Sequence, residues 1–220
     1  MQTIRRTLIR LLALAALATA LPAAAQATVT PLLQPQPTEN PAKIEVIEFF
    51  SYACGHCANL SAPLEAWTAK QPSDVLVKRV AVPGGAAWTI AARLYYTLEI
   101  TGDLAKLDGE VFKAIHEQRV MLFDEKKMLE WLATKGVNTQ KFGDVYKSFS
   151  VQSRLARAEQ LSEAYRKALP KELAENFGVP AIFVDGRFLV GGRGPEALLA
   201  NTEKLIAQVR AERAERAKKK

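Results

Sequence analysis

Residues 44–60 read IEVIEFFSYACGHCANL, and they contain the first strand and the start of the first helix expected after the lead-in. Ile44 to Phe50 is a short, almost continuously apolar run, which is typical of a central strand covered on both faces. Ser51 to Gly55 interrupts this run, and a helix is expected from His56 to about Ala69. A second strand is predicted over Val75 to Val82. Such a strand, helix, strand unit favours a parallel pair joined by a right-handed crossover.

The following ninety or so residues change to helical spacing, and strand signals then return. Asp124 and Asn138 can cap helices within this block, and Phe142 and Phe149 are expected on one helix face. After the block, two short apolar runs flank Asp185-Gly186, a strong signal for a hairpin. A last helix is predicted to follow it. The chain is therefore expected to form an α/β fold interrupted by a helical insertion.

Both ends of the chain are set apart from this core. Residues 1–27 combine a basic start, an apolar stretch and small residues, the pattern of a secretory signal peptide cleaved near Ala25 to Ala27. Residues 28–42 contain four prolines and are expected to be an extended lead-in. Residues 211–220 form a basic tail, expected to be a solvated and fraying helix end. The mature protein is expected to be soluble.

The formal net charge of +7 is located at these two ends. The signal carries three arginines, and the chain from Arg210 to Lys220 holds six basic and two acidic residues. The body between them is therefore neutral. Because nucleic-acid binding requires clustered positive charge, no nucleic-acid partner is expected.

The chain contains two cysteines, Cys54 and Cys57. The stabilisation that a crosslink gives grows with loop length, so a structural disulfide is not expected across so short a loop. The predicted helix points its unpaired N–H groups at Cys54, and both these groups and the adjacent His56 favour a thiolate. Cys57 lies one turn along the helix, within reach of a disulfide. The spacing predicts thiol-disulfide exchange, with Cys54 as nucleophile and Cys57 as resolving thiol.

No metal or other cofactor is expected. A Cys-x-x-Cys pair can supply half of a zinc site, but four ligands are needed and the chain offers only His56 and His116 besides. A copper chaperone would need soft ligands besides the two cysteines. The candidates are Met121 and Met128, but both fall within the predicted helical block.

Three features together resemble the DsbA family of bacterial periplasmic thiol oxidases. They are the run Val46–Cys57, the inserted helices and the run Phe177–Gly186. The resemblance covers nearly all of the chain after the signal. It implies an α/β thioredoxin fold whose two parts, residues 43–85 and 176–210, are separated by an all-helical domain at 86–175.

The resemblance also implies an activity and a set of partners. The protein would be a periplasmic thiol-disulfide oxidase that donates the Cys54-Cys57 disulfide to reduced exported proteins through a mixed disulfide at Cys54. A membrane partner of the DsbB type would reoxidise it, and a monomer is expected. Pro180 matches the family's cis-proline, which faces the cysteines and leaves the backbone of Val179 free to pair with an extended substrate. His56 is expected to tune the redox chemistry.

Glu48 is unusual because a carboxylate inside an apolar strand is costly unless it is paired or functional. It matches the buried acid of the family, which implies that it shuttles a proton for Cys57. Lys78 on the next predicted strand is its candidate partner, and burial would raise the pKa of Glu48. The alternative is that Glu48 faces a solvated edge of the sheet.

Two departures from the family pattern leave other functions open. Gly55 stands where the family usually has proline, and Gly-His between the cysteines is the pair of protein disulfide isomerases, so an isomerase or reductase is the nearest alternative. Periplasmic isomerases carry an N-terminal dimerisation domain that residues 28–42 cannot supply, and Val179 fits the oxidase better than the threonine common there. Ala168–Asn176 looks like an extra segment that would reshape the substrate groove. A metal- or peptide-binding chaperone is the alternative from another class.

Overall fold

The computed structural model describes residues 29–219, so the predicted signal peptide and its cleavage site lie outside the described residues. Its sheet has five strands in the order β1-β5-β4-β2-β3. These strands are β1 (Val29–Pro31), β2 (Ile44–Phe50), β3 (Val75–Ala81), β4 (Ala181–Val184) and β5 (Phe188–Val190). The central strand β2 is buried along its whole length. It pairs in parallel with β3 and antiparallel with β4, which confirms the parallel pair predicted from the sequence.

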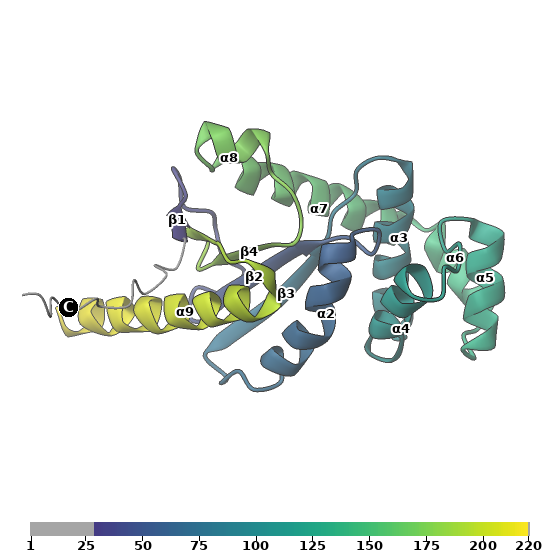
Figure 1. Ribbon diagram of the computed structural model, residues 1–220, viewed down its shortest axis with the longest axis horizontal. Coiled ribbons are helices and arrows are strands. Elements are labelled where there is room, and N and C mark those ends of the chain that lie inside the picture. The colour runs from purple at the N-terminus through teal and green to yellow at the C-terminus, as the bar shows by residue number, and fades with distance from the viewer. Residues whose placement is uncertain (1–28, 220) are drawn as a thin grey trace, which may run out of the picture.

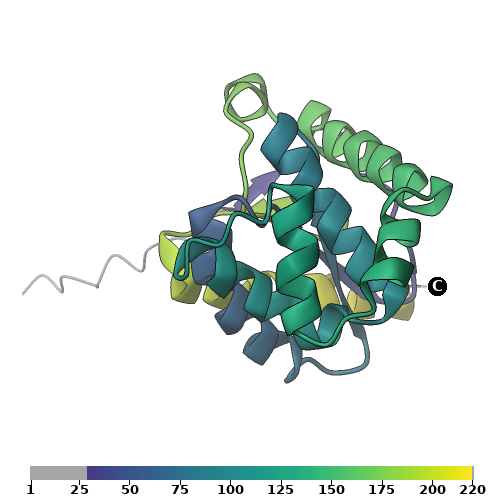
Figure 2. The ribbon, with the colours of Figure 1, turned by 90° about the vertical axis from the view of Figure 1, so that its right-hand side faces the viewer.

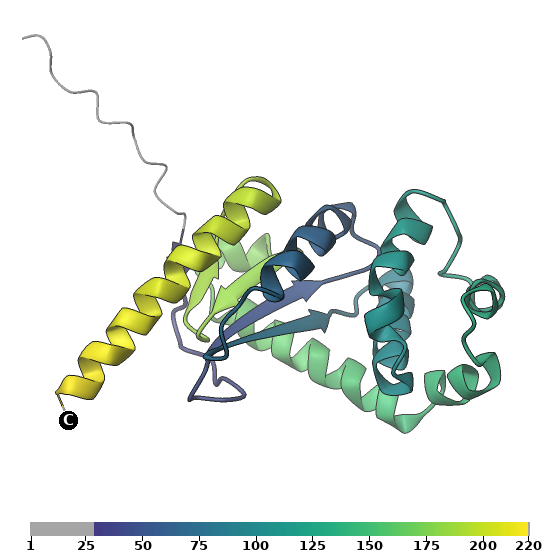
Figure 3. The same cartoon turned by 90° about the horizontal axis from the view of Figure 1, so that it is seen from below.

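Helices cover both faces of the sheet (Figures 1 and 3). One face carries α2 (Gly55–Thr68) and α9 (Gly194–Lys218), and the other carries α7 (Phe149–Lys167). Because side chains alternate along a strand, Ile44 and Val46 of β2 enter the core beneath α2 and α9. Ile47 and Phe49 enter the other core, which continues into the remaining helices. No helix among residues 29–219 is long and apolar enough to span a bilayer.

The remaining helices lie between β3 and β4 in the sequence, and most of them form a group at one end of the sheet (Figure 2). They are α3 (Ala86–Thr101), α4 (Leu104–His116), α5 (Glu125–Thr134), α6 (Thr139–Tyr146) and the short α8 (Lys171–Glu175). Asp124 and Asn138 cap α5 and α6 as predicted. The prediction for Phe149 is wrong, because Ser148 caps a new helix and leaves Phe149 84% exposed at the start of α7.

Both terminal segments are attached to the sheet. Part of the lead-in forms β1, which pairs with β5, and α9 continues through the basic tail as far as Lys218. The Arg213 side chain donates to the carbonyl oxygens of Pro41 and Lys43 and forms an ion pair with Asp185. The expectation of a solvated, fraying tail is therefore wrong at Arg213, because this side chain connects the lead-in to the β4–β5 turn.

The β4–β5 turn has the conformation that Asp-Gly predicts. Asp185 and Gly186 both have positive φ, 59° and 63°, as the two-residue turn that matches strand twist requires. A Cβ atom on Gly186 would lie 2.1 Å from the carbonyl oxygen of Gln36. Only glycine therefore fits at this position without displacing the lead-in.

Gly186→Ala is expected to lower the free energy of unfolding by at least about 2 kcal/mol, because it combines left-handed backbone strain with overpacking. Gly143→Ala is the matched control. Gly143 lies inside α6 with open space around it, so alanine should raise the free energy of unfolding by about 0.5–1 kcal/mol. Urea unfolding of both variants measures the difference. A Gly186 variant as stable as the wild type would contradict the close approach of Gln36.

Candidate active site

Cys54 and Cys57 lie where β2 passes into α2. Cys54 is the half-buried N-cap residue of α2, in an extended conformation, and its carbonyl oxygen accepts the first helical hydrogen bond from Ala58 N at 3.1 Å. Cys57 is buried in the first turn of the helix. This arrangement places one accessible sulfur and one protected sulfur at the end of the helix that attracts negative charge.

The surroundings make the two sulfur atoms electrostatically unequal. A hydrogen bond from the Cys57 side chain, the backbone N–H groups of Cys57 and His56 and the electrostatic effect of His56 lower the pKa of Cys54 to about 6, although burial opposes the change. The same hydrogen bond to Cys54 and burial raise the pKa of Cys57. Cys54 is therefore mainly a thiolate at neutral pH while Cys57 keeps its proton.

The loop before β4 faces Cys54. The Val179–Pro180 peptide bond is cis, in agreement with the resemblance, and the carbonyl oxygen of Val179 lies 3.3 Å from the Cys54 sulfur. A cavity of about 440 Å³ opens beside this loop, lined by Trp88 and Phe177 among others. The segment that looked extra contains α8 and leads directly into this lining. Cys54 therefore lies next to an open surface formed by this loop.

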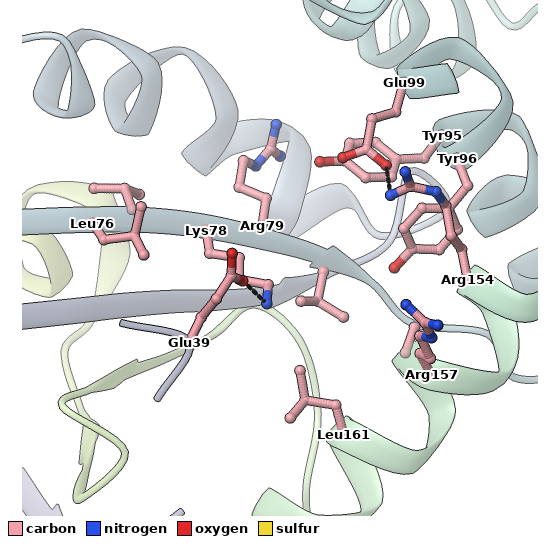
Figure 4. Close-up of a pocket in the computed structure, with 13 residues that line it drawn as sticks. Glu39, Leu76, Lys78, Arg79, Tyr95, Tyr96, Glu99, Arg154, Arg157 and Leu161 are labelled. Carbon is pink, nitrogen blue, oxygen red and sulfur yellow. Dashed lines mark hydrogen bonds and ion pairs between the residues drawn. The ribbon is translucent and has the colours of Figure 1, made fainter. Parts of the chain in front are cut away.

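Glu48 is fully buried on the α2 side of the sheet, and its partner is Arg79 rather than Lys78. The Arg79 Nε atom lies 2.6 Å from Glu48 Oε2, whereas Lys78 pairs with Glu39 at 2.6 Å. The reason is strand alternation, since Glu48 and Arg79 are register partners and a neighbour along β3 points to the opposite face. Figure 4 shows Arg79 and Lys78 on opposite sides of β3, with Lys78 directed to Glu39.

Arg79 belongs to a network that sequence reasoning missed. Its Nη1 atom lies 2.6 Å from Asp108 Oδ2 on α4, and the Tyr52 hydroxyl donates to Asp108 Oδ1 at 2.6 Å. The guanidinium also stacks on the Phe50 ring at 4.1 Å. This network joins the strand, the loop before Cys54 and the inserted helices.

Burial raises the pKa of Glu48, and Arg79 acts in the opposite direction. One carboxylate oxygen of Glu48 accepts from Arg79, while Oε1 is buried and has no hydrogen-bond partner in the described part of the chain, residues 29–219. A buried carboxyl group with a raised pKa keeps its proton to a higher pH than an ordinary glutamate, and such groups beside a cysteine pair are candidates for proton transfer. The solvated-edge alternative for Glu48 is therefore wrong.

His116, considered only as a metal ligand from the sequence, lies beside the same loop. Its Nε2 atom is 2.8 Å from the carbonyl oxygen of Tyr52, and its Nδ1 atom would lie 4.0 Å from a Cβ atom on Gly55. No group of three or more potential metal ligands occurs among residues 29–219. Its contacts place His116 next to the loop between β2 and α2 that carries Cys54.

A thioredoxin-type sheet with a Cys-x-x-Cys pair at a helix N-terminus and a facing cis-proline defines a thiol-disulfide oxidoreductase. The chain matches the model of the DSBA-like thioredoxin domain over residues 80–202. It is 39% identical over 180 residues to the thiol:disulfide interchange protein DsbA of Bordetella pertussis, covering 80% of this chain and 81% of the relative. The DsbA of Pseudomonas aeruginosa is 34% identical over 183 residues, covering 82% of both chains. The chain belongs to the DsbA family.

Solved structures agree with this assignment. Pseudomonas aeruginosa DsbA superposes with a TM-score of 0.77 at 31% identity, covering 86% of this chain and 95% of that one. The oxidoreductase DsbA from Xylella fastidiosa gives a TM-score of 0.72 at 30% identity, covering 83% and 95%. The predicted α/β thioredoxin fold with a helical insertion is confirmed, and the chain is a thiol-disulfide oxidoreductase.

Proposed function

We propose that the protein is an oxidase that donates the Cys54-Cys57 disulfide to reduced exported proteins. The observation that carries this proposal is the unequal pair, with the pKa of Cys54 lowered to about 6 and that of Cys57 raised. Stabilising the Cys54 thiolate favours the reduced enzyme, and a protein with a stabilised reduced form is a strong oxidant. The direction of exchange follows from this inequality.

The reaction proceeds through a mixed disulfide at Cys54. A client thiolate attacks the accessible Cys54 sulfur, the bond to Cys57 breaks, and the Cys57 sulfur leaves with the electron pair and takes a proton from Glu48. A second client thiolate attacks the client sulfur of the mixed disulfide and releases Cys54 as a thiolate, a good leaving group because of its low pKa. The client is oxidised by two electrons and the enzyme is reduced by two.

Val179 and Pro180 form the client-binding edge in this proposal. Val179 lies across from Cys54, so an extended client segment can pair with its backbone while a client sulfur reaches Cys54. His56 is exposed between the cysteines and adds to the stabilisation of the thiolate.

The cellular setting is part of the proposal. Residues 1–27 have the composition of a secretory signal, and the curated relatives carry the name thiol:disulfide interchange protein DsbA. We infer a periplasmic monomer with no cofactor, reoxidised by a membrane protein of the DsbB type.

Equilibration with glutathione, followed by oxidation of a reduced unfolded client, tests the direction of exchange. The oxidase proposal predicts a potential more oxidising than the roughly −180 mV of protein disulfide isomerase, with rapid loss of client thiols. A potential near the roughly −270 mV of thioredoxin would instead support a reductase. Efficient rearrangement of a client with wrong disulfides, exceeding its oxidation, would support the isomerase that Gly55 leaves open.

Glu48→Gln tests the proton transfer to Cys57. We expect reduction of the enzyme disulfide to slow by about 10²–10⁴-fold, the range for loss of a general acid, with little change in fold because glutamine can still accept from Arg79. Stopped-flow reduction by dithiothreitol measures the rate. Glu45→Gln is the matched control, since Glu45 is also buried in β2 but points to the other face of the strand. Equal rates for both variants would remove Glu48 from the mechanism.

A further inference from the structure

The Arg79 guanidinium is divided between two carboxylates. Its Nε atom contacts Glu48 and its Nη1 atom contacts Asp108, both at 2.6 Å. Its Nη2 atom has no hydrogen-bond partner within residues 29–219. Arg79 therefore cannot neutralise Glu48 fully while Asp108 is charged.

The two carboxylates differ in their access to water. The side chain of Glu48 is 1% exposed, whereas that of Asp108 is 21% exposed. Asp108 and Arg79 line a cleft of about 620 Å³ between α2, β3 and α4. The Asp108 carboxylate is therefore less desolvated than the Glu48 carboxylate.

Asp108 lies in the inserted helical domain, but the two side chains that it binds, Arg79 and Tyr52, belong to the thioredoxin part of the fold. It accepts from Tyr52, two residues before Cys54, and it lies on the same helix as His116, which contacts the Tyr52 carbonyl. The insertion thus contributes the charge that competes for Arg79.

We propose that Asp108 is a positioning residue of the redox site, which holds Arg79 between two acids and thereby keeps Glu48 able to carry a proton. This inference rests on the proposed proton transfer from Glu48. The charged and titratable groups that face Glu48 are Arg79 of β3, Asp108 of α4, Tyr95 of α3 and the cysteine pair of α2. Among these groups, Asp108 is the carboxylate that binds the Arg79 guanidinium together with Glu48. It does not contact a reacting sulfur.

Removing the charge of Asp108 should make Glu48 release its proton more readily. In agreement with the geometry, burial raises the pKa of Glu48, Arg79 lowers it and Asp108 raises it. In Asp108→Asn the amide oxygen can still accept from Arg79 and the amide nitrogen can donate to the Tyr52 oxygen. Among residues 29–219, Glu48 is then the one carboxylate beside the Arg79 guanidinium, and the pKa of Glu48 falls.

The test is the pH profile of disulfide reduction by dithiothreitol, with each rate constant divided by the thiolate fraction of the reagent. The wild-type constant should fall as pH rises and Glu48 loses its proton. The fall should begin at lower pH in Asp108→Asn and in the smaller neutral variant Asp108→Ser, and return toward the wild type in Asp108→Glu. On the falling part of the profile, both neutral variants should be slower than the wild type at every pH.

Two further variants separate the possible failures. Glu110→Gln, on the same helix but in a partly exposed ion pair with Lys135, should leave the profile unchanged. In a Glu48→Gln background, Asp108→Asn should have no further effect. Neutral variants whose profiles superimpose on the wild type would overturn the role of Asp108, as would an undiminished effect of Asp108→Asn in the Glu48→Gln background. A wild-type rate constant that does not fall with rising pH would instead contradict the role of Glu48, and with it the proposed proton transfer.

Discussion

Replacing Cys54 with serine is expected to reduce client oxidation by at least about a thousandfold, because Cys57 alone cannot form the Cys54-Cys57 disulfide that oxidises the client. Cys57→Ser should behave differently. This variant keeps the Cys54 thiolate but lacks the thiol that resolves a mixed disulfide. It should therefore accumulate a mixed disulfide between Cys54 and a disulfide-containing client. Client thiol loss measures the first effect, and non-reducing electrophoresis of trapped complexes measures the second.

The pair of variants is its own control, because both remove one sulfur from the same turn. Roughly equal trapping by the two variants would contradict the assignment of roles to Cys54 and Cys57. Activity that survives in the Cys54 variant would contradict the mechanism altogether.

Replacing Arg79 with leucine is expected to lower the free energy of unfolding at neutral pH by about 3–5 kcal/mol, the usual cost of leaving a buried charge without its partner. The effect should depend on pH. Without Arg79 the pKa of buried Glu48 rises further above its unfolded value, so stability is present below the unfolded pKa and is lost as pH rises. Urea unfolding at neutral pH and below the ordinary glutamate pKa measures the difference.

Two comparisons isolate the ion pair from lost packing against Phe50. Arg154→Leu breaks an exposed pair with Glu99 and should cost about 0–1 kcal/mol. The double variant Arg79→Leu with Glu48→Leu should recover much of the loss, because apolar replacement of a whole buried pair is often neutral. A large defect in Arg79→Leu that is independent of pH and persists in the double variant would show that packing, not charge, is responsible.

The loop that carries Cys54 and the strands β2 to β5 could be predicted because their signals are local. β2 is a continuous apolar run, Asp185-Gly186 fixes a two-residue turn, and the cysteines need one helical turn between them. Each pattern depends on neighbours within a few residues, which the sequence displays directly.

The charge network around Glu48 could not be predicted in the same way. Choosing Arg79 over Lys78 requires the register of β2 against β3, and an offset of one residue reverses the face of every side chain. Asp108 comes from an inserted helix whose orientation is set by packing against the sheet end. Glu48 could be recognised from the sequence because a carboxylate within an apolar strand is costly to bury. Asp108 lies in a helical segment where acids are common, so nothing in the sequence connects it with Arg79.

A titration of the Cys54 thiolate by its ultraviolet absorbance, in the reduced protein and in Cys57→Ser, tests whether Cys54 is an anion at neutral pH. We expect an inflection near pH 6 in the reduced protein, and a thiolate inflection that persists in Cys57→Ser assigns it to Cys54. An inflection at about 8.5, the ordinary value for cysteine, would mean that Cys54 is protonated at neutral pH and would contradict the mechanism.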